Sequence, residues 1–198
     1  MAGTRQFDEQ EVIARALDVF WRKGLHDATM LDLAEASGVQ RGSLYNAYGD
    51  KEAIFLRAFD QYTAQFLGAS ASALAEGDMA ARLRTFLDMV IVNMTSGSPA
   101  RGCLTTRTAL DADVSSADVR QRVQSLLNRL EQIVGKAIAA SGKLTPAEAN
   151  RLARVVVTFT RGLAVMERAG HNRKQLREAA ADFIDAVTGR ARYGQGSQ

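Results

Sequence analysis

Cysteine, proline and histidine are scarce in this chain of 198 residues. The single cysteine, Cys103, excludes an intramolecular disulfide framework and any zinc or iron–sulfur site built from several cysteines. Only Pro99 and Pro146 interrupt the backbone, and His26 and His171 are the only histidines. Because proline breaks helices, a chain with so few prolines favours an all-helical fold. With only two histidines, it has few of the side chains that most often serve as general acid or base.

Motifs for catalysis and cofactor binding are also missing. No Glu-x-x-His pair is present for a di-iron bundle, and no glycine-rich phosphate loop follows a predicted strand. The sequence therefore predicts a protein that is not an enzyme, with no metal ion and no cofactor.

Long apolar runs are absent as well. No segment approaches the roughly 20 apolar residues of a membrane span, and the first ten residues, MAGTRQFDEQ, lack the apolar core of a secretory signal. A single cysteine also suits a reducing compartment. We therefore expect a cytoplasmic protein with no membrane partner.

The balance of charge is close to neutral. The net charge is +3, and residues 1–51 carry six Lys and Arg against eight Asp and Glu, so the N-terminal part is acidic. Nucleic-acid binding must therefore depend on where the basic side chains lie, because total charge does not supply it.

Helix signals follow one another closely in the first 50 residues. Asp8 can cap a first helix that ends at Gly24, and Thr29 can cap a short second helix that ends at Gly38. A third short helix is predicted over residues 41–47. Two short helices about a glycine turn form a helix-turn-helix unit.

The rest of the chain predicts longer helices. One begins at Lys51 and reaches about Ala75, and helical periodicity continues to residue 189. The expected fold is all-α with about nine helices: an N-terminal helix-turn-helix domain over residues 1–50, a long connecting helix that opens a helical domain over residues 51–190, and a disordered tail at 191–198. The later helices are expected at about 79–96, 102–112, 116–141, 146–169 and 173–189.

The segment GVQRGSLYNAYGDKEAIF, residues 38–55, concentrates side chains that suit DNA. A helix-turn-helix places the start of its second helix in the major groove. Gly42 permits a close approach to phosphate, while Arg41 and Lys51 supply positive charge at the two ends of the segment. A helical hairpin with a merely solvated face is the alternative interpretation.

The order of features from Phe20 to Phe55 resembles the TetR family of bacterial transcriptional regulators. The shared pattern lies in GLHDATMLDLAEASGVQRGSLYNAYGDKEAIF: a Thr cap, a Gly-Val turn, a further Gly, Leu-Tyr, an aromatic residue, and Lys-Glu-x-hydrophobic-Phe. Beyond Phe55 the chain resembles the family in length and helix count. The resemblance implies a DNA-binding regulator, most simply a repressor of a palindromic operator.

Gln40, Asn46 and Asp50 depart from the usual family pattern. Gln40 and Asp50 stand where the family commonly has a Ser or Thr cap, and Asn46 where a histidine is frequent. Because amide side chains read adenine in two-point contacts, we predict that Gln40 and Asn46 tune the choice of sequence. Together with the positions that match the family, the predicted DNA-binding residues are Thr29, Gln40, Arg41, Gly42, Ser43, Tyr45, Asn46, Tyr48 and Lys51.

A homodimer is expected because one helix-turn-helix buries too little surface for high affinity, so two are normally joined. In the resembled family, the last two long helices of each subunit form the dimer interface. Apolar stripes run along both of the corresponding helices here, although packing inside one subunit explains any single residue equally well. The predicted interface residues are Val155, Val156, Phe159, Leu163, Phe183, Ile184 and Val187.

The resemblance also implies an effector cavity in the C-terminal domain, where an unknown small molecule would release the protein from its operator. Polar groups such as Thr105 and Arg107 are candidates to orient that ligand. Ordinary core packing is the alternative for each residue of the apolar lining. The predicted lining is Phe59, Tyr62, Phe66, Phe86, Met89, Val90, Cys103, Thr106, Leu110, Phe159 and Met166.

Cys103 has a further interpretation. It stands at a predicted helix start, two residues after Arg101, and some members of the resembled family sense electrophiles or oxidants through cysteine. The alternative is a small buried hydrophobic side chain. For the whole chain, the remaining alternative is a helical adaptor that binds other proteins and lacks salt-dependent DNA binding.

Overall fold

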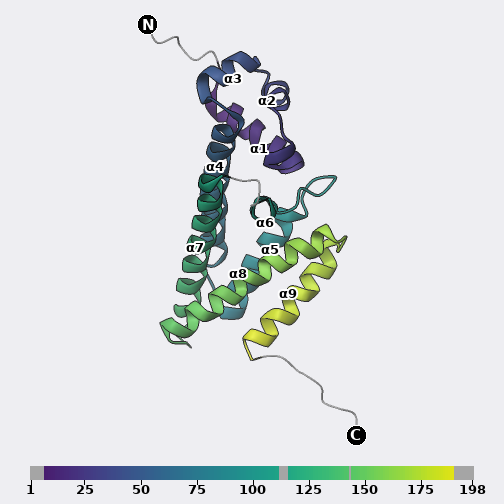
Figure 1. The fold of residues 1–198 in the computed structure, drawn as a ribbon. Helices are drawn as coiled ribbons and strands as arrows, with labels where there is room; N and C mark the ends of the chain where they lie inside the picture. Colours follow the sequence, from purple (N-terminus) through teal and green to yellow (C-terminus); the bar gives the residue numbers. More distant parts are fainter. Residues whose placement is uncertain (1–6, 112–115, 143, 190–198) are drawn as a thin grey trace. The chain divides into compact units, whose positions relative to one another are not determined.

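The computed structural model describes residues 7–111, 116–142 and 144–189, and these residues form nine helices without a strand (Figure 1). The predicted all-α class is thereby confirmed, whereas the predicted tail at 191–198 lies outside the described residues. The helices are α1 (Glu9–Asp27), α2 (Met30–Ser37), α3 (Arg41–Tyr48), α4 (Lys51–Ala73), α5 (Met79–Met94), α6 (Leu104–Leu110), α7 (Ala117–Ala139), α8 (Pro146–Arg168) and α9 (Arg173–Val187).

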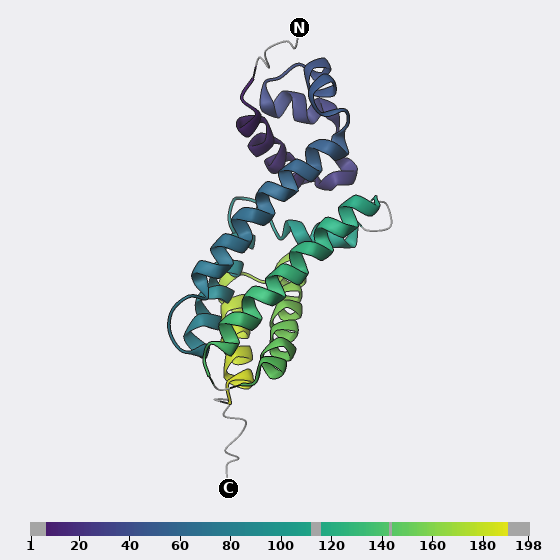
Figure 2. The same cartoon turned by 90° about the vertical axis from the view of Figure 1, so that its left-hand side faces the viewer.

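The described residues divide into two compact units. The first unit holds the residues up to Gln65 together with those of Leu104–Gln124, and the second holds Phe66–Cys103 and those from Ser125 onward. Figure 2 shows α4 as one continuous helix, and its residues belong to the first unit up to Gln65 and to the second beyond it. The predicted domain division at residue 50 stays a prediction.

Aromatic and leucine side chains form the core of the first unit. The rings of Phe20 in α1 and Phe55 in α4 meet edge to face with centroids 5.1 Å apart. Leu33 of α2 and Leu44 of α3 are fully buried. Eight-residue helices are unstable alone, so these two leucines, each worth about 1.5–3 kcal/mol on burial, hold α2 and α3 in place.

Gly24 interrupts the first helix where the sequence predicted a stop. Beyond the interruption, helical turns resume and continue to Asp27. Gly24 itself is not helical, with φ 79° and ψ 174°. Only glycine adopts this positive φ at little cost, so Gly24 ends the regular helix, and residues 25–27 form a short helical stretch beyond the break.

Helices α5, α8 and α9 pack together in the second unit. Phe86 and Ile91 of α5, Val156 of α8 and Ile184 of α9 are buried in this core. Within the described ranges no helix is long and apolar enough to cross a membrane.

A capping box starts the second helix of the predicted DNA-binding unit. Thr29 accepts a hydrogen bond from the Asp32 amide at 3.1 Å, and the Asp32 carboxylate accepts one from the Thr29 amide at 2.9 Å. Lys23 of α1 lies 2.5 Å from the same carboxylate. The hydrogen bond from Lys23, followed by those from Thr29, lowers the pKa of Asp32 from 3.8 to about 2.

We predict that Asp32→Asn destabilises the protein near neutral pH and that the deficit disappears in acid. The folded pKa lies below the ordinary one, so the charged carboxylate stabilises the fold above about pH 4 and this contribution is lost as pH falls through about 2. Thermal unfolding of both proteins from pH 7 to pH 2 measures the difference. Lys23→Gln should reduce the same pH dependence, and a deficit of Asp32→Asn that stays constant at every pH would contradict the argument.

Candidate DNA-binding site

The turn between α2 and α3 gives the site its geometry. Gly38 ends α2 in the left-handed conformation, with φ 68°, and α3 begins at Arg41. The side chains of Leu44 and Tyr48 then face the interior of the unit. Since these two residues are four apart on one side of α3, the opposite side of the helix is left for a partner.

The exposed side of α3 carries most of the predicted DNA-binding residues. Arg41, Gly42, Tyr45 and Asn46 are exposed, and Ser43 is half-buried. The Arg41 guanidinium lies 5.9 Å from the centre of the Tyr45 ring, so the two side chains form one surface. A β-carbon built on Gly42 would meet no atom within 4 Å, which leaves the backbone open to close approach.

Gln40 begins α3 without using its side chain. It occupies the N-cap position, is exposed, and makes no side-chain cap hydrogen bond. A Ser or Thr at this position would normally accept a bond from the helix amides. The Gln40 amide is therefore available to a partner.

The side chains of Thr29, Asp50 and Lys51 are held by contacts within the protein. The Thr29 hydroxyl donates to the Asp32 carboxylate at 2.9 Å. The Lys51 ammonium donates to the His26 carbonyl at 2.9 Å, at the end of α1. Asp50 accepts from the Ala53 amide at 2.8 Å, so it caps α4 as a Ser or Thr would. These hydrogen bonds position Thr29 and Lys51. A DNA phosphate that bound either side chain would have to share its donor with the present acceptor or displace that acceptor.

Tyr48 differs from the rest of the predicted set because it is only 8% exposed. Its ring lies 6.4 Å from that of Phe7, and the Arg57 guanidinium lies 5.4 Å from its centre. Arg57 also forms an ion pair with Glu9. The ring of Tyr48 therefore packs α3 against neighbouring elements.

The residues predicted at the dimer interface fall into two groups. Val156, Leu163 and Ile184 are buried within the second unit. By contrast, Val155 is 51% exposed, and the half-buried rings of Phe159 and Phe183 stack with centroids 4.1 Å apart and an angle of 5° between their planes. Val187 is half-buried. The sequence pattern found the helices but did not separate their two faces.

The residues predicted to line the effector cavity belong to both units. Phe59, Tyr62, Thr106 and Leu110 belong to the first unit and the other seven to the second. Leu110 is 76% exposed and Met166 42% exposed, so neither lies in a core. The remaining large apolar members are buried or half-buried: Phe59, Tyr62, Phe66, Phe86, Met89, Val90 and Phe159.

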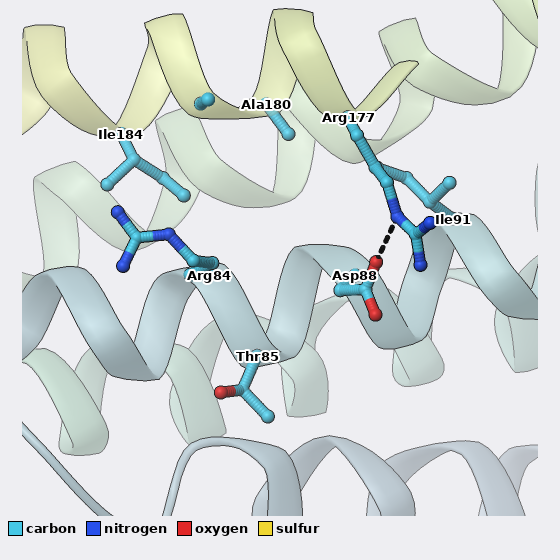
Figure 3. A pocket seen from close by; sticks show the side chains of 8 residues that line it. Arg84, Thr85, Asp88, Ile91, Arg177, Ala180 and Ile184 are labelled. Carbon is cyan, nitrogen blue, oxygen red and sulfur yellow. Dashed lines mark hydrogen bonds and ion pairs between the residues drawn. The ribbon is translucent and has the colours of Figure 1, made fainter. Parts of the chain in front are cut away.

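A groove between α5 and α9 has a volume of about 420 Å³ (Figure 3). Ile91, Ala180 and Ile184 give it an apolar floor, and an ion pair of 2.6 Å between Asp88 and Arg177 closes one end. Arg84, Thr85 and Ala181 complete the lining. None of these eight residues except Ile184 was predicted to be functional, because the groove depends on the packing of two distant helices.

Cys103 is half-buried and has a cationic neighbour. One nitrogen of the Arg161 guanidinium, on α8, donates to its sulfur at 3.4 Å. Glu167 lies on the same helix, and one of its carboxylate oxygens is buried without a hydrogen-bond partner among the described residues. Burial raises the pKa of Glu167 above its ordinary value.

A helical pair with this turn, an inward apolar side and an outward polar side defines a helix-turn-helix DNA-binding protein. The family model for bacterial regulatory proteins of the tetR family matches residues 12–58, and the model for the C-terminal domain of LmrA/YxaF-like transcriptional regulators matches residues 79–182, more than half of the chain. The chain belongs to the TetR family of DNA-binding transcriptional regulators. Membership of a family of regulators also confirms that it is not an enzyme.

Characterised relatives agree with this assignment. The transcriptional repressor ComR of Escherichia coli is 22% identical over 184 residues, which cover 90% of this chain and 88% of ComR. A cysteine mutant of the regulator CifR, solved with a 26-bp operator duplex, is 26% identical, with a TM-score of 0.80 and coverage of 92% of this chain and 98% of CifR. Reduced NemR of E. coli shares the fold, at 16% identity, a TM-score of 0.79 and coverage of 89% and 94%.

We predict that Gln40→Ala changes the preferred DNA sequence without a loss of stability. The side chain caps nothing, so its removal leaves α3 intact, whereas the loss of a two-point contact with a base typically costs about 1–3 kcal/mol of discrimination. Selection from random duplexes with each protein measures the preference, and thermal unfolding measures stability. Gln121→Ala, at an exposed position on α7, is the control. An identical motif from wild type and Gln40→Ala would refute a role in sequence choice.

Proposed function

We propose that this regulator is a homodimeric repressor that binds a palindromic operator and leaves it when a small molecule binds the C-terminal domain. The observation that supports the homodimer is an exposed apolar stripe formed by Val155, Phe159, Gly162 and Met166 of α8 and Phe183 of α9.

In the proposed complex of this protein with DNA, Gln40, Arg41, Ser43 and Asn46 lie near bases. Thr29, Gly42, Tyr45 and Lys51 contact the phosphate backbone, and Tyr48 supports them from the packed side of α3.

The stripe runs along the second half of α8. Val155, Phe159, Gly162 and Met166 follow one another at intervals of four, three and four residues, so they share one side of the helix. Val155 and Met166 are substantially exposed, and a β-carbon built on Gly162 would meet nothing within 4 Å. Contiguous exposed apolar surface of this kind marks an interface, and a glycine in it permits a close approach of helices.

Phe183 continues the stripe onto α9. Its ring stacks on Phe159, and Ala179 and Ala186, four residues before it and three after, are exposed. A second copy that brings the same stripe would form an interface of four helices with twofold symmetry. Twofold symmetry in the protein favours a palindromic operator, with half-sites about 34–36 Å apart or a multiple of that distance.

The repressor role is supported by ComR, which is a repressor. Release by an effector requires a ligand that binds better to a form whose α3 helices do not fit the operator. A coupling of about 1–3 kcal/mol would lower DNA affinity about 5- to 150-fold. Apolar and methionine side chains of the predicted lining, such as Phe86, Met89 and Val90, suit such a ligand.

Selection of bound duplexes from random DNA, at two salt concentrations, tests the proposed function. A palindromic motif is expected, with affinity that falls steeply with salt because the protein displaces counterions from several phosphates. Recovery of sequences without a palindrome would overturn it.

We predict that Gly162→Leu yields a folded monomer that no longer binds the selected duplex. Leucine suits a helix, and the position is open in one subunit, so the fold survives, but the side chain holds the two stripes apart. Sedimentation measures the oligomeric state and far-UV circular dichroism the fold. Arg154→Leu places the same side chain about 80° round the helix from Gly162 and should remain a dimer that binds DNA. If the Gly162→Leu variant is still a dimer, the interface does not lie at the stripe on α8 and α9.

An electrophile is a second candidate effector. The observation that favours it is the hydrogen bond from the Arg161 guanidinium to the half-buried Cys103 sulfur, since an adduct on that sulfur would break a contact with α8. In such a reaction the sulfur bonds to an electrophilic carbon and the thiol proton passes to the adduct or to water.

We predict that N-ethylmaleimide lowers operator binding of the wild type and leaves Cys103→Ser unaffected. The sulfur adds to the double bond of the maleimide, and the bulky product separates Cys103 from Arg161. Titration of the selected duplex before and after treatment measures the effect. Cys103 is the only cysteine, so Cys103→Ser is a complete control. Equal loss of binding in both proteins would remove the thiol from the mechanism.

A further inference from the structure

Two carbonyls just before the break in α1 at Gly24 accept hydrogen bonds from a cation of α6. One nitrogen of the Arg107 guanidinium donates to the Trp21 carbonyl at 3.0 Å and to the Arg22 carbonyl at 3.0 Å. Both helices belong to the first unit, and they contact each other (Figure 1). The last carbonyls of a helical stretch lack partners in their own helix, and a cation there also suits the helix dipole.

The break at Gly24 makes room for this contact. A β-carbon built on Gly24 would lie 2.9 Å from the Nε atom of Arg107 and 3.4 Å from its Cζ atom. Glycine suits this position in two ways: it adopts the positive φ at little cost, and it leaves to the guanidinium a space from which a β-carbon would displace it. A residue that serves only to end a helix would need the first property alone.

A second contact ties α6 to α4 beside the first. The Tyr62 hydroxyl and the buried Thr105 hydroxyl are 3.2 Å apart, and the Trp21 ring meets the Tyr62 ring edge to face at 5.3 Å. Trp21 thus has its carbonyl on Arg107 and its indole on Tyr62. Three helices meet at one residue of α1.

The end of α1 also carries contacts to the DNA-binding segment. The His26 carbonyl accepts from Lys51, three residues after the end of α3, and Lys23 pairs with Asp32 in the first turn of α2. Any movement of this end of α1 therefore acts on the helices before and after the turn at Gly38. Arg107 lies outside the helix-turn-helix in sequence but holds the element that supports it.

We propose that Arg107 is a positioning residue for DNA binding: its guanidinium, seated at Gly24, fixes the end of α1 and through it α2, α3 and Lys51. The DNA-binding form is the one in which this contact is made. From the sequence, Arg107 was a candidate to orient a ligand; in this proposal its guanidinium instead binds the Trp21 and Arg22 carbonyls. The inference rests on the proposed operator binding. Its test also includes the fluorescence of Trp21, which is measured without DNA.

Arg107→Ala and Gly24→Ala are the test variants, and the duplex selected with the wild type is the probe. Arg107→Ala should weaken binding about tenfold or more, since a hydrogen bond from a charged donor is worth at least that factor in an equilibrium constant. Gly24→Ala should do the same with Arg107 still present, because the new methyl group displaces the guanidinium. Arg107→Lys, which keeps one cationic donor, should recover most of the lost affinity.

Gly142→Ala separates this effect from a general loss of stability. Gly142 has φ 69° and a built β-carbon with nothing within 4 Å, so alanine brings the backbone strain without displacing a side chain. We expect a lowered melting temperature and unchanged operator affinity. If Gly142→Ala loses affinity in proportion to stability as the other two variants do, Arg107 is only structural and the proposal fails.

Trp21 supplies the readout that needs no DNA. It is the only tryptophan in the chain and it is buried at the contact, so its emission should shift to longer wavelength in Arg107→Ala and Gly24→Ala but not in Gly142→Ala. Unchanged emission, or operator affinity of Arg107→Ala equal to that of wild type, overturns the proposal. Failure of the wild type to select a palindrome overturns the proposed function instead, and the emission result then decides the role of Arg107.

Discussion

The DNA-binding surface depends on one constraint: two helices of eight residues cannot stand alone in water. Leu33 and Leu44 supply the burial that keeps them, and they do so by taking one side of each helix out of contact with any partner. The polar side chains of α3 are therefore directed outward as a consequence of folding. The side chains of α3 proposed to contact DNA are therefore those that do not pack in the core.

The start of α4 and the end of α1 show how closely support and recognition are combined. Lys51 is placed by the His26 carbonyl, and Asp50 caps the helix that Lys51 begins. A phosphate that approached here would meet a lysine that is already oriented and a carboxylate that already accepts a backbone amide. Orientation lowers the entropy lost on binding, while the shared hydrogen bond limits the gain from charge.

Much of this architecture could be predicted because its signals are local. Caps such as Thr29 and turns such as Gly38 are encoded within a few residues, and the helix-turn-helix follows from them. Contacts between distant segments are different in kind. Arg107 and Trp21 are 86 residues apart, and no spacing rule connects them. The same reason explains why the stripe of α8 was found but Val156 was not assigned to the buried side and Val155 to the exposed side, and why the α5–α9 groove was missed.

The empty cap at the start of α3 has an evolutionary consequence. A side chain that supports no hydrogen bond within the fold can be exchanged with little penalty to stability, as Gln40 illustrates. Most positions on a DNA-binding surface must satisfy both folding and recognition, which slows their change. With the base contact proposed for Gln40, the two demands are separated at this position, so duplicated copies of such a regulator could diverge in the operators they recognise while keeping one scaffold.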